Sequence, residues 1–208
     1  MATRGKFIAF EGIDGSGKSS QVQMLKHQLE QSGHKVYCTF EPTDNRIGTT
    51  IRGILKGEDK ADNLTIAALF AADRLHHILN ERDGLLKKLK EGYIVLCDRY
   101  YFSSYAYHSV YMEMEWVIEI NKKSADLLRP DLNLFIDVSP EIAMQRIQNN
   151  RAEVELYETM DMLKSVYHNY HLAFEKMKRE EKIVSIAGNH SLDKIAADIL
   201  GKVTSILF

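Results

Sequence analysis

The sequence contains few cysteines, few prolines and no long uncharged apolar run, and each shortage excludes a class of protein. Its two cysteines, Cys38 and Cys97, are too few for a disulfide framework. Both stand within apolar runs, so we expect reduced and buried thiols. No apolar run approaches the length of a membrane span. The first apolar run, residues 7–10, meets Glu11 and is too short for a signal-peptide core, so we expect a cytoplasmic protein.

Neither sign of charge dominates the chain, which has 27 lysines and arginines against 29 aspartates and glutamates. The net charge of −2 gives no basic field that would attract the molecule to nucleic acid or an anionic membrane, so we expect neither partner. Any phosphate chemistry must therefore depend on local cations. With 208 residues, no internal repeat and no obvious linker, the chain is expected to form a single domain over residues 1–208.

Short apolar segments alternate with longer segments of helical period along the chain. The short segments are mostly apolar throughout, which is typical of parallel strands covered on both faces. They are residues 7–11, 35–40, 93–98, 132–138 and 182–187. Helical signals are clearest from residue 18, after Asn63, over 85–90, after Ser139 and over 192–207. The alternation predicts an α/β fold with a mostly parallel sheet flanked by helices.

The segment Gly12-Ile13-Asp14-Gly15-Ser16-Gly17-Lys18-Ser19 matches the phosphate-binding pattern G-x-x-x-x-G-K-[ST] in full. It follows the first predicted strand and opens a predicted helix, which is the setting that this P-loop motif requires. Its glycines let backbone N–H groups point inward around phosphate oxygens. Lys18 would reach the β- and γ-phosphates of ATP, and the Ser19 hydroxyl would ligate Mg²⁺. The predicted ATP-binding residues of this segment are Gly12, Asp14, Gly15, Ser16, Gly17, Lys18, Ser19 and Ser20.

A phosphate-binding loop alone does not distinguish a kinase from a GTPase or a motor ATPase. A GTPase would need an N-K-x-D loop to read guanine. The Asn121-Lys122 pair falls inside a helix-like segment and is followed by Lys123-Ser124, so the guanine-reading aspartate is missing. A motor ATPase would normally be longer. We therefore expect a small nucleotide or nucleoside kinase.

Two further pairs of residues suit a second substrate. Asp98 and Arg99 follow a predicted strand, and ligands bind at the carboxyl ends of strands in open parallel sheets. Asp98 would hold Mg²⁺ or its waters and Arg99 would neutralise phosphate, unless the two only form an ion pair that closes the strand. Phe70 and Arg74 lie one helical turn apart, where a ring and a planar cation would hold a flat base. The alternative for Phe70 is a core residue.

These residues belong to segments that give the chain a resemblance to the thymidylate kinase family, particularly to the branch that includes archaeal members. The matching segments follow one another in the family's order and span nearly the whole chain. They run from Phe10 to Ser19, Glu41 to Arg52, Leu69 to Arg74, Asp98 to Tyr107 and Pro130 to Val138.

The resemblance implies a three-layer P-loop kinase fold, with a five-stranded parallel sheet and a short lid at residues 146–156. It implies transfer of the γ-phosphoryl group of ATP to dTMP, with Mg²⁺ as cofactor, and a homodimer. Asp14 would bond the acceptor 3′-hydroxyl, Phe70 would stack on thymine, Arg74 would bond its carbonyl edge, and Tyr107 would exclude ribonucleotides. The implied acceptor-binding residues are Asp14, Glu41, Phe70, Arg74, Arg99, Ser104, Tyr107, His108 and Tyr157.

The chain departs from the family pattern at three places. Phe40 replaces an arginine of many relatives, and His108 replaces a usual glutamine, which leaves base recognition open. Gly15 stands where some relatives have a catalytic arginine, and relatives without it usually supply cations from the lid. We expect Arg151, or otherwise Arg146, to close over the ATP phosphates. The predicted catalytic residues are Lys18, Arg99 and Arg151.

Two alternatives remain beside a thymidylate kinase. One is a kinase for another (deoxy)nucleoside monophosphate or for a deoxynucleoside, and the other is a non-catalytic ATP-binding module. The pairs His76-His77 and His168/His171 invite a metal site, but no cluster of cysteines or carboxylates completes either pair. We therefore expect surface or core histidines.

Overall fold

A five-stranded parallel sheet forms the centre of the molecule in the computed structural model, which describes residues 4–150 and 159–207. The strand order is β2-β3-β1-β4-β5. The strands are β1 (Phe7–Glu11), β2 (Val36–Phe40), β3 (Ile94–Asp98), β4 (Leu132–Asp137) and β5 (Ile183–Ala187). The predicted sheet is confirmed, and each predicted strand differs from the observed one by at most one residue at either end.

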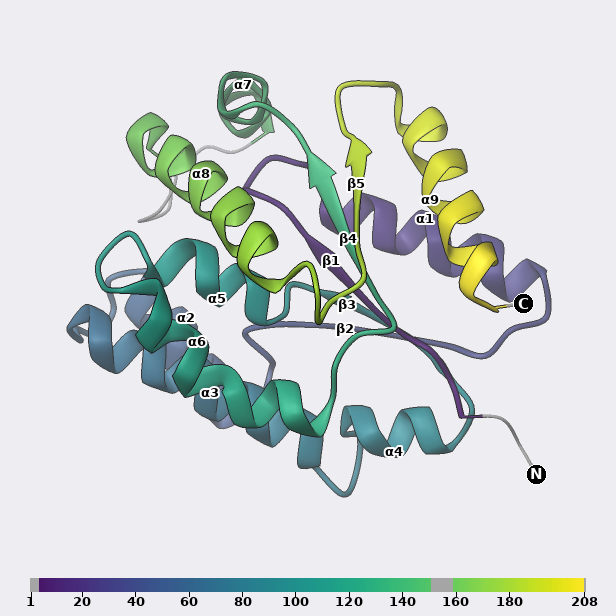
Figure 1. The fold of residues 1–208 in the computed structure, drawn as a ribbon, viewed down its shortest axis with the longest axis horizontal. Helices are drawn as coiled ribbons and strands as arrows, with labels where there is room; N and C mark the ends of the chain where they lie inside the picture. The colour runs from purple at the N-terminus through teal and green to yellow at the C-terminus, as the bar shows by residue number, and fades with distance from the viewer. Residues whose placement is uncertain (1–3, 151–158, 208) are drawn as a thin grey trace.

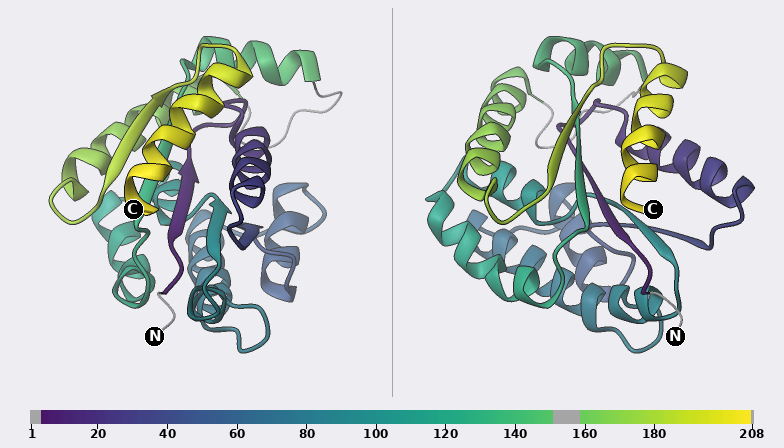
Figure 2. Two further views of the ribbon diagram at one scale, coloured as in Figure 1. Left: turned by 90° about the vertical axis from the view of Figure 1, so that its right-hand side faces the viewer. Right: turned by 45° about the vertical axis from the view of Figure 1, so that its right-hand side comes forward.

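Helices cover both faces of this sheet, which gives the three layers that the family resemblance implied (Figure 1). They are α1 (Lys18–Gln31), α2 (Arg46–Leu55), α3 (Asn63–Leu79), α4 (Leu85–Lys90), α5 (Tyr101–His108), α6 (Met114–Leu127), α7 (Pro140–Asn150), α8 (Met160–Met177) and α9 (Leu192–Leu207). Figure 2 shows α1 and α9 on one side of the sheet and α5, α6 and α8 on the other. Among the described residues, no helix is both long and apolar enough to cross a membrane.

The burial of each strand follows its place in the sheet. All five residues of β1 are buried, because β3 and β4 flank β1 and helices cover both of its faces. The edge strands β2 and β5 are only partly buried. Continuous apolar runs therefore mark the central strands, as expected, whereas the edge strands admit residues such as Thr39 and Ser185.

Helices α2 and α5 were not predicted from the sequence. In α5 all eight residues are buried, so the helix has no polar face and its sequence shows no helical period. Its aromatic residues also favour strands when considered alone. Helix α2 begins where the Asn45 side chain accepts hydrogen bonds from the backbone N–H groups of Ile47 and Gly48.

Candidate active site

The P-loop joins the carboxyl end of β1 to α1, and its lysine is held close against the loop. Lys18 Nζ donates hydrogen bonds to the carbonyl oxygens of Gly12 and Ile13, each at 2.9 Å. Burial, assisted by the neighbouring Arg99 guanidinium, lowers the pKa of Lys18 to about 8. The lysine is therefore still mainly a cation at neutral pH, and a bound phosphate group would further favour its protonated form.

Oxygen donors of the P-loop helix and of β3 lie side by side. Ser19 Oγ donates a hydrogen bond of 2.5 Å to Asp98 Oδ2. These residues come from the first turn of α1 and from the last residue of β3. A hydroxyl and a carboxylate are hard oxygen ligands of the kind that Mg²⁺ prefers, so this pair fits the metal that the sequence analysis assigned to it.

Gly15 lies against α7, and this contact explains why the position has no side chain. Its φ angle is +76°, in the left-handed region that favours glycine. An ideal Cβ atom at Gly15 would overlap the backbone carbonyl oxygen of Ala143. An arginine at this position, as in some relatives, would require α7 to move away from the loop.

Arg99 stands at the centre of the site, directly after β3. It is the one non-glycine residue with positive φ (71°) in the described part of the chain, and its backbone N–H donates to the carbonyl oxygen of Phe10. Its guanidinium forms an ion pair with Asp14 and hydrogen bonds to Ser103 Oγ (3.1 Å) and Tyr107 Oη (3.1 Å). The strained backbone conformation is thus held by several contacts, as is common at functional sites.

Asp14 is oriented by two neighbours. Tyr107 Oη donates a hydrogen bond of 2.8 Å to Asp14 Oδ2, while the Arg99 guanidinium contacts the other oxygen. Burial opposes ionisation, but the cations Arg99 and Lys18 outweigh it and lower the pKa of Asp14. The side chain of Asp14 is therefore a carboxylate. It lines both of the cavities that are described below.

A buried glutamate, Glu11, accepts hydrogen bonds from residues next to Arg99. Glu11 is fully buried, and burial raises the pKa of its carboxyl group. It accepts hydrogen bonds from the backbone N–H of Tyr100 (2.9 Å), from Ser103 Oγ (2.6 Å) and from Tyr170 Oη (3.1 Å). Glu11 therefore connects β1, the turn that carries Arg99, and α8.

Two adjoining cavities meet at Asp14, Glu41 and Arg99. The cavity along the P-loop measures about 850 Å³ and includes Gly15, Gly17, Lys18, Ser19 and Ser20 in its lining. The second is a smaller cavity of about 230 Å³. Its lining includes Phe70, Arg74, Ser104, Tyr107 and His108. Asp14, Glu41 and Arg99 line both cavities, so the two predicted binding regions share a boundary.

His108 and Phe70 face each other in the smaller cavity, with ring centroids 5.0 Å apart. Burial, assisted by the nearby Arg74 cation, lowers the pKa of His108 to about 3. The imidazole is therefore neutral and offers one donor and one acceptor. Among the residues that the structure describes, neither ring nitrogen of His108 has a hydrogen-bond partner.

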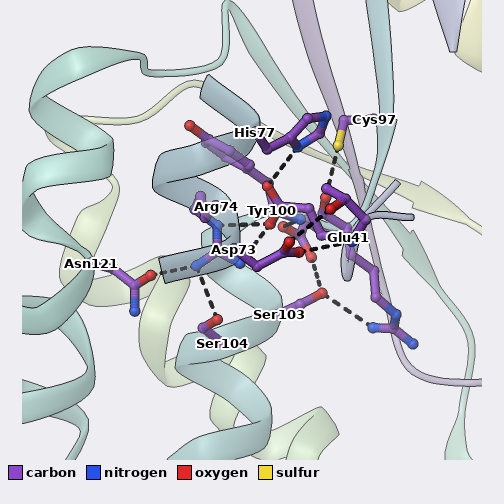
Figure 3. A network of polar contacts seen from close by, with 12 residues as sticks. Glu41, Asp73, Arg74, His77, Cys97, Tyr100, Ser103, Ser104 and Asn121 are labelled. Carbon is purple, nitrogen blue, oxygen red and sulfur yellow. Dashed lines mark hydrogen bonds and ion pairs between the residues drawn. The ribbon is translucent and has the colours of Figure 1, made fainter. Parts of the chain in front are cut away.

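Arg74 is held from several directions, as Figure 3 shows. It is only 1% exposed. Its Nε donates to Glu41 Oε2 at 2.8 Å and its Nη2 pairs with the same oxygen at 2.7 Å. Its Nη1 donates to Ser104 Oγ (3.1 Å) and to Asn121 Oδ1. The guanidinium is thus fixed at the wall of the smaller cavity before any ligand arrives.

Part of this network was not predicted from the sequence. Asn121 was considered only as part of a guanine-reading motif, yet it contacts Arg74. From the sequence, no cluster of carboxylates and cysteines was expected beside His77. The structure places such residues there, although they are distant in the sequence. Glu41, His77 and Cys97 place potential ligand atoms within 4.8 Å of one another. Hydrogen bonds to Arg74 and His77 already occupy the Glu41 carboxylate, so this cluster does not indicate a metal site.

The predicted lid lies partly outside the described residues. Arg146, on α7, donates hydrogen bonds to the carbonyl oxygens of Gly188 (2.8 Å) and Ser16 (3.4 Å) and lines the P-loop cavity. Arg151 and Tyr157, like the rest of the segment 151–158, are outside the part of the chain that the structure describes.

The parallel sheet, the P-loop with its lysine and the adjoining smaller cavity define a P-loop phosphotransferase of the nucleotide kinase class. A family model described as thymidylate kinase matches residues 10–199. The chain belongs to the thymidylate kinase family.

Curated relatives from archaea and bacteria resemble the chain over nearly its full length. A probable thymidylate kinase of Pyrococcus horikoshii is 36% identical, over 96% of each chain. The thymidylate kinase of Caldicellulosiruptor saccharolyticus is 36% identical, over 98% of this chain and 96% of its own. That of Ligilactobacillus salivarius is 38% identical, over 98% of this chain and 99% of its own.

Proposed function

We propose that the chain transfers the γ-phosphoryl group of ATP to dTMP, giving dTDP and ADP. The observation that carries this proposal is the shared boundary between the P-loop cavity and the smaller cavity, formed by Asp14, Glu41 and Arg99. A donor and an acceptor bound on either side of this boundary would bring their phosphates together. Membership of the thymidylate kinase family identifies the acceptor.

On the donor side, the P-loop binds the phosphates of ATP. Its backbone N–H groups and the N-terminus of α1 attract phosphate oxygens. Lys18 exchanges its two hydrogen bonds to loop carbonyls for contacts with the β- and γ-phosphates. Arg146 lines the same cavity and would contact the donor nucleotide. Arg151, which the sequence analysis placed in the lid, completes the set of cations around the transferred group.

On the acceptor side, the smaller cavity binds dTMP. Phe70 stacks on thymine, and Arg74, supported by Ser104, bonds its carbonyl edge. Asp14 accepts a hydrogen bond from the 3′-hydroxyl, because it is held ionised beside Arg99. Tyr107, fixed against Asp14, leaves no room for a 2′-hydroxyl. Glu41 and Tyr157 complete the acceptor-binding residues.

Mg²⁺ is the cofactor that fits the oxygen donors of the site. Ser19 and Asp98 would hold it directly or through its waters. When bound, the ion neutralises negative charge on the phosphates of ATP.

Transfer then depends on position and on charge. The acceptor phosphate is already an anion at neutral pH, so no general base is needed. Lys18, once it contacts the β- and γ-phosphates, and Arg99, which donates a hydrogen bond to Ser103, would stabilise the negative charge that develops on the transferred group. Such preorganised cations lower the barrier because they need not reorient during transfer.

We further propose that residues 1–208 form a single domain and that the protein acts as a cytoplasmic homodimer. Helices α2 and α3, between β2 and β3, would form the contact. Leu64 and Leu79 on α3 are 56% and 53% exposed, so a partner that covered this helix would bury them. Light scattering would give the mass of the assembly, and a monomeric mass would contradict the dimer.

A coupled assay for ADP release tests the proposed function. With ATP and Mg²⁺, dTMP should accelerate ADP release far above the rate without an acceptor. Lys18→Ala should reduce kcat on the order of 100-fold or more. A panel of dUMP, dCMP, dGMP and thymidine would show whether another acceptor is preferred. No ADP above background with any acceptor would indicate a non-catalytic ATP-binding module and contradict the proposal.

A further inference from the structure

Glu41 is one of the residues that hold Arg74, and Glu41 itself is held by a further residue on the side away from Arg74. His77 Nδ1 lies 3.0 Å from Glu41 Oε1, and the Arg74 guanidinium occupies Oε2. Because a carboxylate oxygen can only accept, the Nδ1 atom of His77 must carry the proton and donate it. The two oxygens of Glu41 therefore have different partners, and the carboxylate cannot rotate without losing one.

The imidazole of His77 is oriented from its other end. Thr39 Oγ1, on the edge strand β2, lies 2.8 Å from His77 Nε2. His77 is 7% exposed and Glu41 is 4% exposed, so the contact between these two side chains is largely buried. A continuous chain of hydrogen bonds thus runs from Thr39 through His77 and Glu41 to Arg74.

The loop that carries Glu41 is fixed separately from its carboxylate. Asp73, on α3, accepts hydrogen bonds from the backbone N–H (2.8 Å) and the hydroxyl (2.7 Å) of Thr43. The backbone after Glu41 would therefore keep its place if His77 were removed, whereas the carboxylate would lose a partner. Figure 3 shows His77 beyond the Glu41 carboxylate, with Ser104 and Asn121 at the opposite end of Arg74.

We infer that His77 is a positioning residue of the acceptor site, which acts through Glu41 to fix the guanidinium of Arg74 for the base of dTMP. The inference rests on the proposed function, because it assigns Arg74 to the acceptor base. His77 does not line the smaller cavity, so a ligand bound there would not contact it directly. Its effect should therefore fall on acceptor binding and leave the P-loop and its charges unchanged.

A separate cavity gives access to His77 from outside the site. It measures about 670 Å³, lies between β2 and the end of α3, and is lined by Thr39, His76 and His77 among others. A small molecule could thus enter the space left by a shortened side chain at position 77. The neighbouring His76 is exposed, and its ring contacts Asn80 instead of Glu41, so it provides a matched control.

Steady-state kinetics of His77→Ala test the inference. The KM for dTMP should rise roughly tenfold, as expected when a buried carboxylate loses a donor, while kcat and the KM for ATP stay within about twofold. Added imidazole, or the variant His77→Asn with its amide donor near the Nδ1 position, should restore most of the lost affinity. His76→Ala should change none of these values.

Three results would overturn the inference. One is an unchanged KM for dTMP in His77→Ala. Another is a His77→Ala variant in which kcat and the KM for ATP change as much as the KM for dTMP, and in which neither added imidazole nor the His77→Asn substitution restores them. Such a result would indicate that His77 has a general structural role. If His77→Ala does not fold, Thr39→Val decides in its place. Its KM for dTMP should rise roughly threefold, and an unchanged KM would overturn the inference.

The wild-type protein separates this inference from the proposed function. If the wild type phosphorylates dTMP, and His77→Ala and Thr39→Val keep the wild-type KM for dTMP, only the positioning role is overturned. A wild type without activity on dTMP overturns the proposed function, and the positioning role with it.

Discussion

The charged side chains of the site are held in defined ionisation states by burial and by their neighbours. Lys18 loses proton affinity because it is buried beside Arg99, whereas Asp14 stays ionised because two cations outweigh its burial. His108 is neutral because it is buried near Arg74. At the scale of single residues, these states give predictions for pH dependence and for specificity.

The lowered pKa of Lys18 predicts a loss of activity at alkaline pH. Only the protonated amine neutralises phosphate, and burial lowers its pKa to about 8. Since kcat/KM for ATP reports the free enzyme, it should decrease above this pH by about tenfold per pH unit. In Lys18→Arg the alkaline decrease should disappear, because a guanidinium keeps its proton. A wild-type profile that stays flat to about pH 10 would contradict this prediction.

The neutral imidazole of His108 predicts a role for its ring nitrogens in base recognition. His108→Leu fills similar space without a donor or an acceptor, and kcat/KM for dTMP should fall roughly tenfold. His108→Gln keeps both functions and should stay within about threefold of the wild type. Equal values for His108→Leu and the wild type would show that the ring serves only as packing against Phe70.

The close approach of α7 to Gly15 predicts a stability cost for any side chain there. Gly15→Ala should lower the free energy of unfolding by about 1–3 kcal/mol, because of its positive φ and the overlap with Ala143. Gly201→Ala, in open space on α9, should instead raise it by about 0.5–1 kcal/mol. Urea denaturation measures both values. A Gly15→Ala protein as stable as the wild type would contradict the observed contact.

At the scale of elements, the strands were predictable and some helices were not. The central strands are apolar runs because their positions in the sheet bury them, whereas the edge strands are only partly buried. Helix α3 was predictable from its period, but the predicted cap Asn63 was wrong by one residue, because Asp62 is the residue that accepts a hydrogen bond from the backbone N–H of Thr65. Helix α5 is buried on every side, so its structure depends on α6 and α8 around it and not on its own sequence.

The contact between α8 and Glu11, at the end of β1, predicts a stability difference between two tyrosines of that helix. Tyr170 Oη bonds Glu11 and Ser103 in a fully buried setting, whereas Tyr167 Oη bonds Asp137 (2.8 Å) where water can enter. Tyr170→Phe should lower the free energy of unfolding by about 1–3 kcal/mol, and Tyr167→Phe by less than about 1 kcal/mol. Equal losses in chemical denaturation would contradict the role assigned to Glu11.

At the scale of the whole molecule, residues within one motif were predictable and residues joined only by folding were not. The P-loop was identified because strand, glycines, lysine and helix are adjacent in the sequence. The contacts from Asn121 to Arg74 and from His77 to Glu41 join elements far apart in the chain, and no spacing rule connects them. The first contact follows from the packing of α3 against α6, and the second from the loop after β2, which brings Glu41 beside α3.

The central claim is that this molecule moves one phosphoryl group between two bound nucleotides. The most direct test uses ATP labelled in its γ-phosphate, together with dTMP and Mg²⁺, and separates the nucleotide products. The account predicts label in dTDP, formed in step with ADP, and its loss in Lys18→Ala. Label that appears only as inorganic phosphate, at a rate independent of dTMP, would contradict it.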